Sequence, residues 1–134
     1  MCTVIYLPGE AGKPTFFSVR DEHRARPVAH LPQCLKTGDV DILAPIDPLG
    51  GGSWIGVNTF LDTIILFNGA FEKHLPQVAY RMSRGLILRK LLETGTPLVE
   101  WAFLDLTDIE PFSLLVYTDD QLYRVTWDGF DKHR

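Results

Sequence analysis

This sequence of 134 residues has two cysteines, no excess of basic charge and no long apolar run. No apolar run approaches the roughly 20 residues that span a bilayer, so we expect no transmembrane segment. The formal net charge is −4, and the densest basic stretch, RDEHRARP, also contains two acids. Nucleic-acid-binding proteins present a basic face, so this composition argues against a nucleic-acid partner.

The first residues lack the positively charged leader and apolar run of a secretion signal, so we expect a cytoplasmic protein. Disulfides form in oxidising compartments, and we therefore predict that Cys2 and Cys34 are free thiols. The histidines lack the spacing of zinc ligands, so we expect neither a metal site nor a cofactor. They stand at scattered positions: His23, His30, His74 and His133. His74 has no visible partner in the sequence, so we expect it to be exposed.

The residues that are present have the proportions of an ordinary globular protein. Hydrophobic residues make up 46% and charged residues 22%, which is enough to build an apolar core. The length fits a single domain over residues 1–134.

The N-terminal part of the sequence predicts a hairpin. CTVIYL (2–7) and TFFSVR (15–20) are rich in β-branched and aromatic residues, and a polar turn at 9–14 separates them. The following segment, 23–41, contains two prolines and a glycine and shows no sustained period. We expect it to be an irregular loop with Arg26 at its surface, and long ordered loops are often functional.

Further strands are expected in the middle of the chain. DILAPI (41–46) is a short candidate that Pro45 weakens or places at an edge. Three glycines precede a second candidate at 53–58, and a tight turn accounts for them without a phosphate site. DTIILFN (62–68) is a continuous apolar run that fits a strand buried on both faces.

The C-terminal part predicts helices and then a second hairpin. SRGLILRKLLETG has leucines at helical spacing, which predicts a helix at 83–95 with Ser83 as its cap. A proline suits the first turn of a second helix at 97–105. FSLLVYTDDQLYRVTW predicts two strands around a turn at Asp119 and Asp120. The fold class is therefore α+β, with a mostly antiparallel sheet and helices packed on one face.

The position of Cys2 directly after Met1 leaves two interpretations open. If Met1 is removed, Cys2 carries a thiol and a free α-amine, which is a nucleophile with a base attached. If Met1 stays, Cys2 is a small apolar residue at the start of a strand.

Four ordered segments together resemble one family: MCTVIY, VRDEHRARP, GGGSWIGVN, and NGAFEKH followed by SRGLIL. They are similar to the NRDE family, also called transport-and-Golgi-organisation-2-like proteins, which is named after an Asn-Arg-Asp-Glu signature. Here the signature reads Val19-Arg20-Asp21-Glu22, with valine in place of asparagine. The chain is shorter than we expect for this family.

The resemblance implies an N-terminal-nucleophile (Ntn) hydrolase-like fold, of which this chain would form part of an α/β/β/α sandwich. It also implies three catalytic residues. Cys2 matches the nucleophile, Asp21 matches an aspartate beside the nucleophile's α-amine, and Asn68 matches an oxyanion-hole asparagine.

Three residues are candidates for binding a substrate, and each has a structural alternative. Arg20 belongs to the signature, but we favour an ion-pair role for it. Trp54 fits the core or the wall of a pocket. Arg84 at a helix start fits an anion contact, whereas Ser83 is the more ordinary explanation of that start as a cap.

Three functions remain open from the sequence, of which the least specific is a remnant of the longer family that acts by association. The first is hydrolysis of a carbon–nitrogen (amide) bond of an unidentified small molecule through a cysteine acyl-enzyme. A thiol of pKa near 8.5 is mostly protonated at neutral pH, and an α-amine of pKa about 7.7–8 would take its proton. The second is non-catalytic ligand binding or trafficking, because the family is linked to Golgi organisation and haem handling. Haem would need an axial ligand, for which Cys2 and His23 are the candidates.

The apolar strands also predict an assembly. CTVIYL, DTIILF and FSLLVY are too apolar to leave one sheet face in water, so we expect a homodimer.

Overall fold

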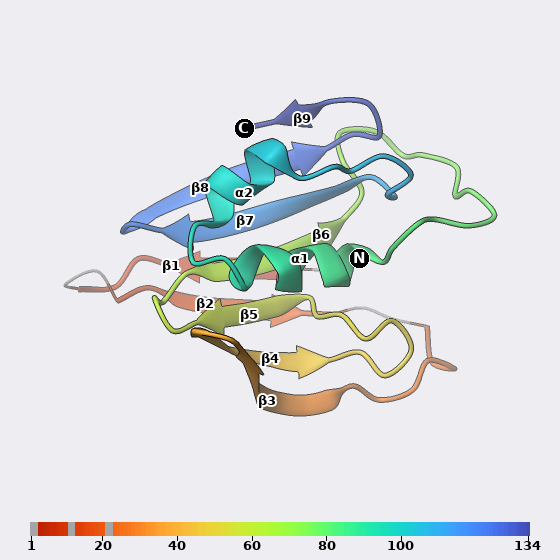
Figure 1. Cartoon of the computed structure of the whole chain (residues 1–134). Coiled ribbons are helices and arrows are strands. Elements are labelled where there is room, and N and C mark those ends of the chain that lie inside the picture. Colours follow the sequence, from red (N-terminus) through yellow and green to blue (C-terminus); the bar gives the residue numbers. More distant parts are fainter. Residues whose placement is uncertain (1–2, 11–12, 21–22) are drawn as a thin grey trace.

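The computed structural model describes residues 3–10, 13–20 and 23–134. Strands β1 (Thr3–Leu7) and β2 (Thr15–Val19) form a two-stranded antiparallel hairpin. The other strands form one seven-stranded antiparallel sheet in which spatial order follows chain order (Figure 1). They are β3 (His30–Thr37), β4 (Val40–Ile46), β5 (Ile55–Asn58), β6 (Thr63–Asn68), β7 (Phe112–Thr118), β8 (Gln121–Trp127) and β9 (Lys132–His133).

Helices α1 (Arg84–Leu92) and α2 (Pro97–Phe103) cover one face of the large sheet (Figure 1). Alternate residues of a strand point to the same face, and alternate residues of β6 and β7 pack against the helices. The buried residues at this interface are Ile64, Leu66, Phe112, Leu114 and Val116 from the strands, and Ile87, Leu88, Leu91 and Leu92 from α1. Neither helix, nor any other in the described part of the chain, is long and apolar enough to cross a membrane.

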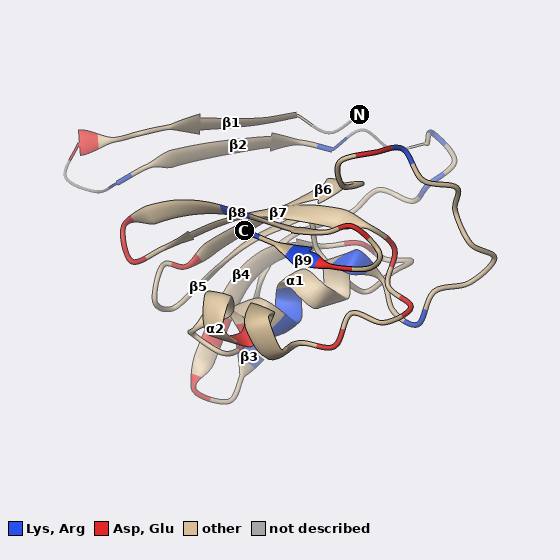
Figure 2. Cartoon of the chain, turned by 90° about the horizontal axis from the view of Figure 1, so that it is seen from above, with Lys and Arg blue, Asp and Glu red and all other residues tan. Residues whose placement is uncertain are grey.

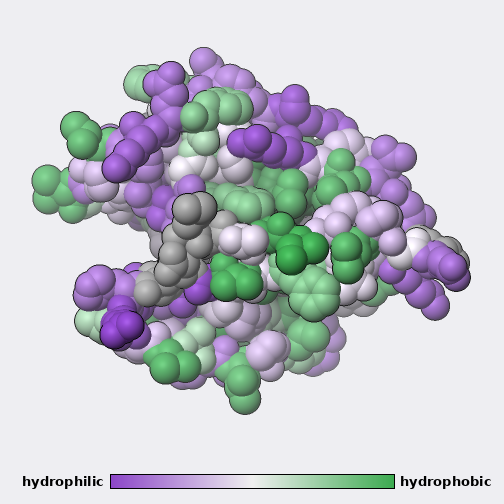
Figure 3. Space-filling model, turned by 180° about the vertical axis from the view of Figure 1, so that it is seen from behind, coloured by the Kyte–Doolittle hydropathy of each residue, from purple (hydrophilic) through white to green (hydrophobic). Residues whose placement is uncertain are grey.

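The β1–β2 hairpin lies on the face of the sheet opposite the helices (Figure 2). The Phe16 ring meets the Tyr117 ring of β7 edge-on, with the ring centroids 5.7 Å apart. Because side chains alternate along a strand, the hairpin turns its other side outward. The outward apolar side chains are each at least half exposed: Ile5 (51%), Leu7 (50%), Phe17 (53%) and Val19 (62%). Figure 3 shows hydrophobic side chains gathered on this side of the molecule.

The structure confirms the α+β class, the mostly antiparallel sheet and the helices on one face. The N-terminal hairpin, the strand at 62–68 and both helices are present with small differences at their ends. The turn between β7 and β8 is also confirmed. Asp119 and Asp120 have φ values of 50° and 56°, the left-handed conformation that a two-residue hairpin turn requires.

The prediction of an irregular loop at 23–41 is wrong, because this segment contains β3 and the start of β4. Pro32 lies in the edge strand β3, where the pairing with β4 shifts register between His30 and Gln33. An edge strand tolerates such an interruption, so the proline did not prevent a strand. Cys34, expected in a loop, is an exposed residue of β3.

Strand β4 pairs on both sides, so the edge position suggested for it by Pro45 is also wrong. Its pairs with β5 end at Ile42 and Leu43, before the proline is reached. The two-residue strand β9 was not predicted, because two residues carry no pattern. The four-layer sandwich implied by the family resemblance is not confirmed.

The backbone of the glycine loop before β5 touches the start of α1. A Cβ atom on Gly52 would lie 2.4 Å from the carbonyl carbon of Gly85, and one on Gly85 would lie 2.8 Å from the carbonyl oxygen of Ser53. The Ser53 amide donates to the Gly85 carbonyl at 3.2 Å. Arg89 Nη1 donates to the Gly51 carbonyl at 2.6 Å. These contacts join the β4–β5 connection to α1, and they require that positions 52 and 85 have no side chain.

We predict that Gly52→Ala lowers the free energy of unfolding by about 1–3 kcal/mol, because the new methyl group meets backbone that cannot swing aside. Urea denaturation measures this loss. Gly50→Ala is the matched control. Its Cβ would meet first an Asp47 carboxylate oxygen at 3.3 Å, which belongs to a side chain. The control should lose less than about 1 kcal/mol, and equal losses in the two variants would contradict the role given to Gly52.

Candidate functional site

A cavity of about 210 Å³ opens where the end of the hairpin meets the glycine loop and the start of α1. We call it the arginine cavity. Four predicted site residues line it: Arg20, Trp54, Asn68 and Arg84. The other described residues of its lining are Arg26, Asp47, Gly52, Ser53, Leu66, Ser83 and Gly85.

The four predicted residues come from separate parts of the chain. Arg20 follows β2 and Trp54 precedes β5, whereas Asn68 ends β6 and Arg84 begins α1. Asn68 is exposed and lies opposite Phe112 in the β6–β7 pair. The fold therefore brings these residues to one place from positions up to 64 apart in the sequence (84 − 20).

Cys2 and Asp21 lie outside the described residues, so the predicted closeness of these two side chains stays a prediction. The described residues next to them in the sequence are Thr3 and Arg20, and they show which end of the hairpin lies at the cavity. Thr3, the first described residue of β1, pairs with Val19 of β2. The residue after Val19 is Arg20, which lines the cavity.

Asp47 is a buried carboxylate that holds two arginines of the cavity. Its Oδ2 accepts a hydrogen bond from Arg20 Nη2 at 3.2 Å and another from Arg26 Nη2. Its Oδ1 accepts the Leu49 amide at 3.1 Å. Burial by itself would raise the pKa of Asp47. The hydrogen bonds from Arg26 and Leu49, with the charges of Arg26 and Arg20, outweigh burial and lower the pKa below its ordinary value of 3.8.

Arg20 makes a second contact, with Trp54. The guanidinium carbon lies 4.7 Å from the centroid of the indole ring, within the range of a cation–π interaction. Trp54 is half-buried and also packs against the core, so the core and pocket-wall interpretations describe one and the same position. The ion pair favoured for Arg20 is present, with Asp47 as a partner.

Arg84 and His74 share one carboxylate. Arg84 Nη2 lies 3.0 Å from Glu110 Oε2, and His74 Nε2 lies 3.1 Å from Glu110 Oε1. The sequence showed no partner for His74 and predicted that it is exposed; this prediction is wrong. Ser83 occupies the N-cap position, but its side chain makes no capping hydrogen bond. Its hydroxyl instead donates to the Gly50 carbonyl at 3.4 Å.

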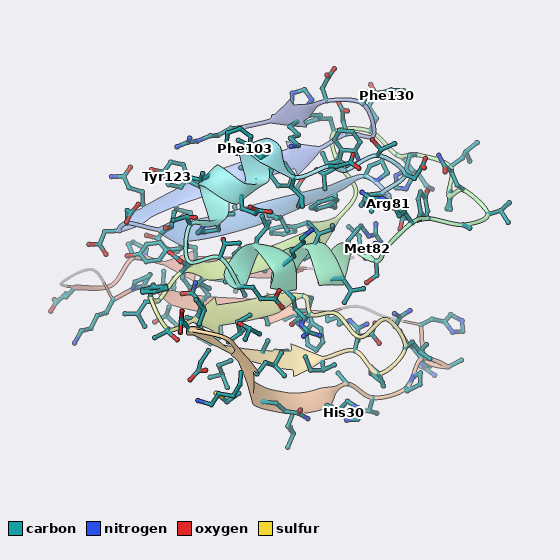
Figure 4. All side chains as sticks on the ribbon, viewed as in Figure 1. His30, Arg81, Met82, Phe103, Tyr123 and Phe130 are labelled. Carbon is teal, nitrogen blue, oxygen red and sulfur yellow. The ribbon has the colours of Figure 1, made fainter. Side chains whose placement is uncertain are left out.

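Arg81 and Met82 lie in the segment that enters α1 (Figure 4). Arg81 Nη2 donates to the Asp105 carbonyl at 2.7 Å, and its Nε donates to the Thr107 carbonyl at 3.0 Å. Met82 packs against the hydrophobic core. These contacts fix the first turn of α1 and with it the backbone of Arg84.

The described lining of the arginine cavity contains three arginines and one carboxylate. Guanidinium groups bind carboxylate and phosphate oxygens through paired hydrogen bonds, and the Asn68 amide both donates and accepts. The volume is below the roughly 300–1,000 Å³ of most drug-sized ligand sites. The cavity therefore suits a small anionic or amide-bearing group. Within the described residues, no group of three His, Cys, Asp or Glu side chains is placed to hold a metal ion.

Sequence reasoning missed Arg26 and Asp47. Arg26 was expected to be a surface loop residue, but its side chain is only 33% exposed and pairs with Asp47. The available signal was weak: a single acid, three residues before the glycine triplet, with no pattern linking it to the arginines at 20–26. Only the fold shows that these residues meet.

We predict that Asp47→Asn lowers the free energy of unfolding at pH 7 by about 1–3 kcal/mol, because charge-assisted hydrogen bonds from two arginines are lost. The folded-state pKa of Asp47 is lowered, so its stabilising contribution is present above the unfolded pKa. The contribution disappears as the pH falls through the folded pKa. The difference between wild type and variant should therefore narrow below about pH 4.

Urea denaturation at pH 7 and at successively lower pH values measures this difference. Asp39→Asn is the control, because Asp39 is exposed in the turn between β3 and β4. It should change stability by less than about 0.5 kcal/mol. A difference for Asp47→Asn that stays constant down to the acid limit of folding would contradict the proposed ionic role.

Comparison with known proteins gives one match. The family model described as Transport and Golgi organisation 2 matches residues 1–129. Searches of curated proteins and of solved structures found no match. An Ntn-hydrolase-like fold is not confirmed by these comparisons. The family match includes all six predicted site residues, and the chain belongs to the Transport and Golgi organisation 2 family.

Proposed function

We propose that this chain hydrolyses an amide bond, with Cys2 as the nucleophile and the arginine cavity as the substrate site. The observation that carries the proposal is the place of the cavity at the open end of the hairpin. Thr3 pairs with Val19, and Arg20 follows at the cavity wall. In the sequence, Cys2 directly precedes Thr3 and Asp21 directly follows Arg20, so both proposed catalytic residues neighbour this end of the hairpin along the chain.

The chemistry needs Met1 to be removed, so that Cys2 has a free α-amine. The amine accepts the thiol proton, directly or through one water, and Asp21 orients the amine. The thiolate attacks the amide carbon, and the Asn68 amide donates to the oxygen that becomes negative. The carbon–nitrogen bond breaks as the amine product takes the proton, which leaves a thioester on Cys2. Water then attacks the thioester, releasing a carboxylic acid and restoring the thiol.

The substrate class follows from the lining. Arg20 and Arg84 would bind an anionic group of the substrate, while Trp54 forms a wall behind Arg20. A volume of about 210 Å³ limits the bound portion to a small group. We therefore propose a small amide that carries a carboxylate or a similar anion.

A second function, non-catalytic binding or trafficking, is supported by the family description and by the same lining. The ion pairs with Asp47 and the contact with Trp54 hold Arg20 in place before a ligand arrives. Such a cavity would bind an anion without reacting with it. His23, the alternative axial ligand for haem, is exposed and is absent from the described lining of the cavity.

We also propose a homodimer, in which the outer face of the hairpin is covered by a second copy of the chain. Its support is the row of exposed apolar side chains on β1 and β2, with Ile5 directly opposite Phe17. Apolar side chains this exposed on adjacent strands form a continuous surface that association would remove from water.

We predict that iodoacetamide alkylates Cys2 faster than Cys34 by about tenfold at neutral pH, because a neighbouring amine and cationic groups raise the thiolate fraction. Intact mass first establishes that Met1 is absent, and peptide mass spectrometry then follows each thiol. Cys34 is a suitable internal reference, since it is an exposed free cysteine on an edge strand.

Cys34→Ser is the control and should leave the rate at Cys2 unchanged. Equal rates at the two thiols, or labelling of Cys34 alone, in protein that lacks Met1 would contradict the nucleophilic role of Cys2.

We predict from the hairpin surface that light scattering at micromolar concentration gives the mass of two chains, and that Phe17→Ser shifts it towards one chain. Leu75→Ser is the control, because Leu75 is 92% exposed and lies far along the chain from the hairpin. A monomer mass for the wild type, or dissociation by both variants alike, would rule out the proposed interface.

A further inference from the structure

A second and larger cavity, of about 690 Å³, lies at the other end of the hairpin. We propose that it binds a small amphiphilic cation, with an ammonium head against Asp62, Asp119 and Asp120 and an apolar chain along the opposite walls. This inference is independent of the proposed amide hydrolysis. None of the six predicted site residues is in its described lining.

The two cavities are separated by the length of a strand. Lys13, just before β2, belongs to the larger cavity, whereas Arg20, just after β2, belongs to the arginine cavity. The five residues of β2 span about 16 Å at 3.3 Å per residue. A molecule bound in one cavity therefore does not occupy the other.

Apolar walls are built from the hairpin on one side and from the β5–β6 and α1–α2 connections on the other. The Phe16 ring is held edge-on against Tyr117. The Phe60 ring lies on Gly95, where a Cβ atom would be 2.7 Å from a ring carbon. Leu98 packs partly against the core and also lines the cavity.

Leu61, also in the lining, has an unusual backbone. Its φ is 68°, a conformation that is costly for a leucine, and its side chain is 73% exposed. This conformation belongs to the turn between β5 and β6, in which the Leu61 amide donates to the Asn58 carbonyl at 3.0 Å. The side chain stands at the cavity with most of its apolar surface uncovered.

The polar end of the cavity is acidic. Asp119 and Asp120 form the β7–β8 turn, and both are exposed. Asp62 is only 5% exposed, although it is a carboxylate. The hydrogen bonds to its side chain come from neutral groups, the Asn58 amide at 2.8 Å and the Thr118 hydroxyl at 2.6 Å.

The charged residues of the lining favour a positively charged ligand. Among the described lining residues there are three carboxylates and one amine, that of Lys13. Figure 2 shows acidic residues at this end of the molecule. An ammonium group gains from the carboxylates and from the aromatic rings in the lining, which are those of Phe16, Phe60 and Tyr117, whereas an anionic amphiphile is repelled. The volume lies within the range of sites for small organic ligands.

The test is isothermal titration of the whole chain with octyltrimethylammonium below its micelle-forming concentration. Octanoate, with a similar chain and the opposite charge, is the matched probe. We expect saturable binding of the cation and at least fivefold weaker binding of the anion. Equal or tighter binding of octanoate, or no binding of the cation, would overturn the proposal.

Asp119→Asn with Asp120→Asn removes two charges without disturbing the turn, because asparagine accepts the left-handed conformation of both positions. We expect this double variant to weaken cation binding about fivefold. The control is Asp39→Asn with Asp131→Asn, which changes the net charge equally at exposed sites absent from the described lining. Equal weakening by both pairs would show a general charge effect and would overturn the site.

Comparing Phe60→Ala with Phe17→Ala distinguishes binding in the cavity from binding on the apolar outer face of the hairpin. Phe60→Ala should weaken binding of the cation, whereas Phe17→Ala on that outer face should leave it unchanged. Circular dichroism establishes that each variant is folded. Loss of binding in Phe17→Ala with retention in Phe60→Ala would place the cation on the hairpin surface and contradict the proposal.

Discussion

The contact between Gly52 and Gly85 is the constraint on which the candidate site depends. Backbone meets backbone there, so the loop before β5 and the first turn of α1 are fixed relative to each other. Asp47 precedes this loop and Arg84 lies in that turn. Both line the arginine cavity, and Asp47 in turn holds Arg20 and Arg26. One close approach of two glycines thus sets the position of charged groups from several parts of the chain.

The two ends of the hairpin lie at two cavities of opposite charge. At its open end the described residues supply three arginines and one carboxylate, and at its turn they supply three carboxylates and one lysine. The middle of the hairpin is held by aromatic contacts between Tyr6, Phe16 and Tyr117. A small cationic cavity and a larger acidic one therefore lie at opposite ends of β2, as two separate sites.

Sequence patterns predicted most of the fold because the residues within each helix, strand or turn favour that conformation by themselves. The Asp119–Asp120 turn and the buried run of β6 are encoded by residues next to one another. The family resemblance implied Asn68 and included Arg20 in its signature. The local sequence suggested Trp54 and Arg84, and all four residues line one cavity. What could not be predicted depends on contacts between distant residues. Strand β3 forms despite Pro32 because β4 pairs with it, and Asp47 finds Arg20 and Arg26 only after folding.

The most direct test of the account is a search for the acyl group on Cys2. Protein that lacks Met1 is mixed with a panel of small N-acyl amino acids, quenched in acid and digested, and the N-terminal peptide is weighed. We predict that at least one substrate adds the mass of its acyl group to the peptide that begins with Cys2, and that Cys2→Ser with the same N-terminus releases no amine. A free N-terminal cysteine that gains no acyl mass from any member of the panel, while the amides stay intact, would contradict the catalytic assignment.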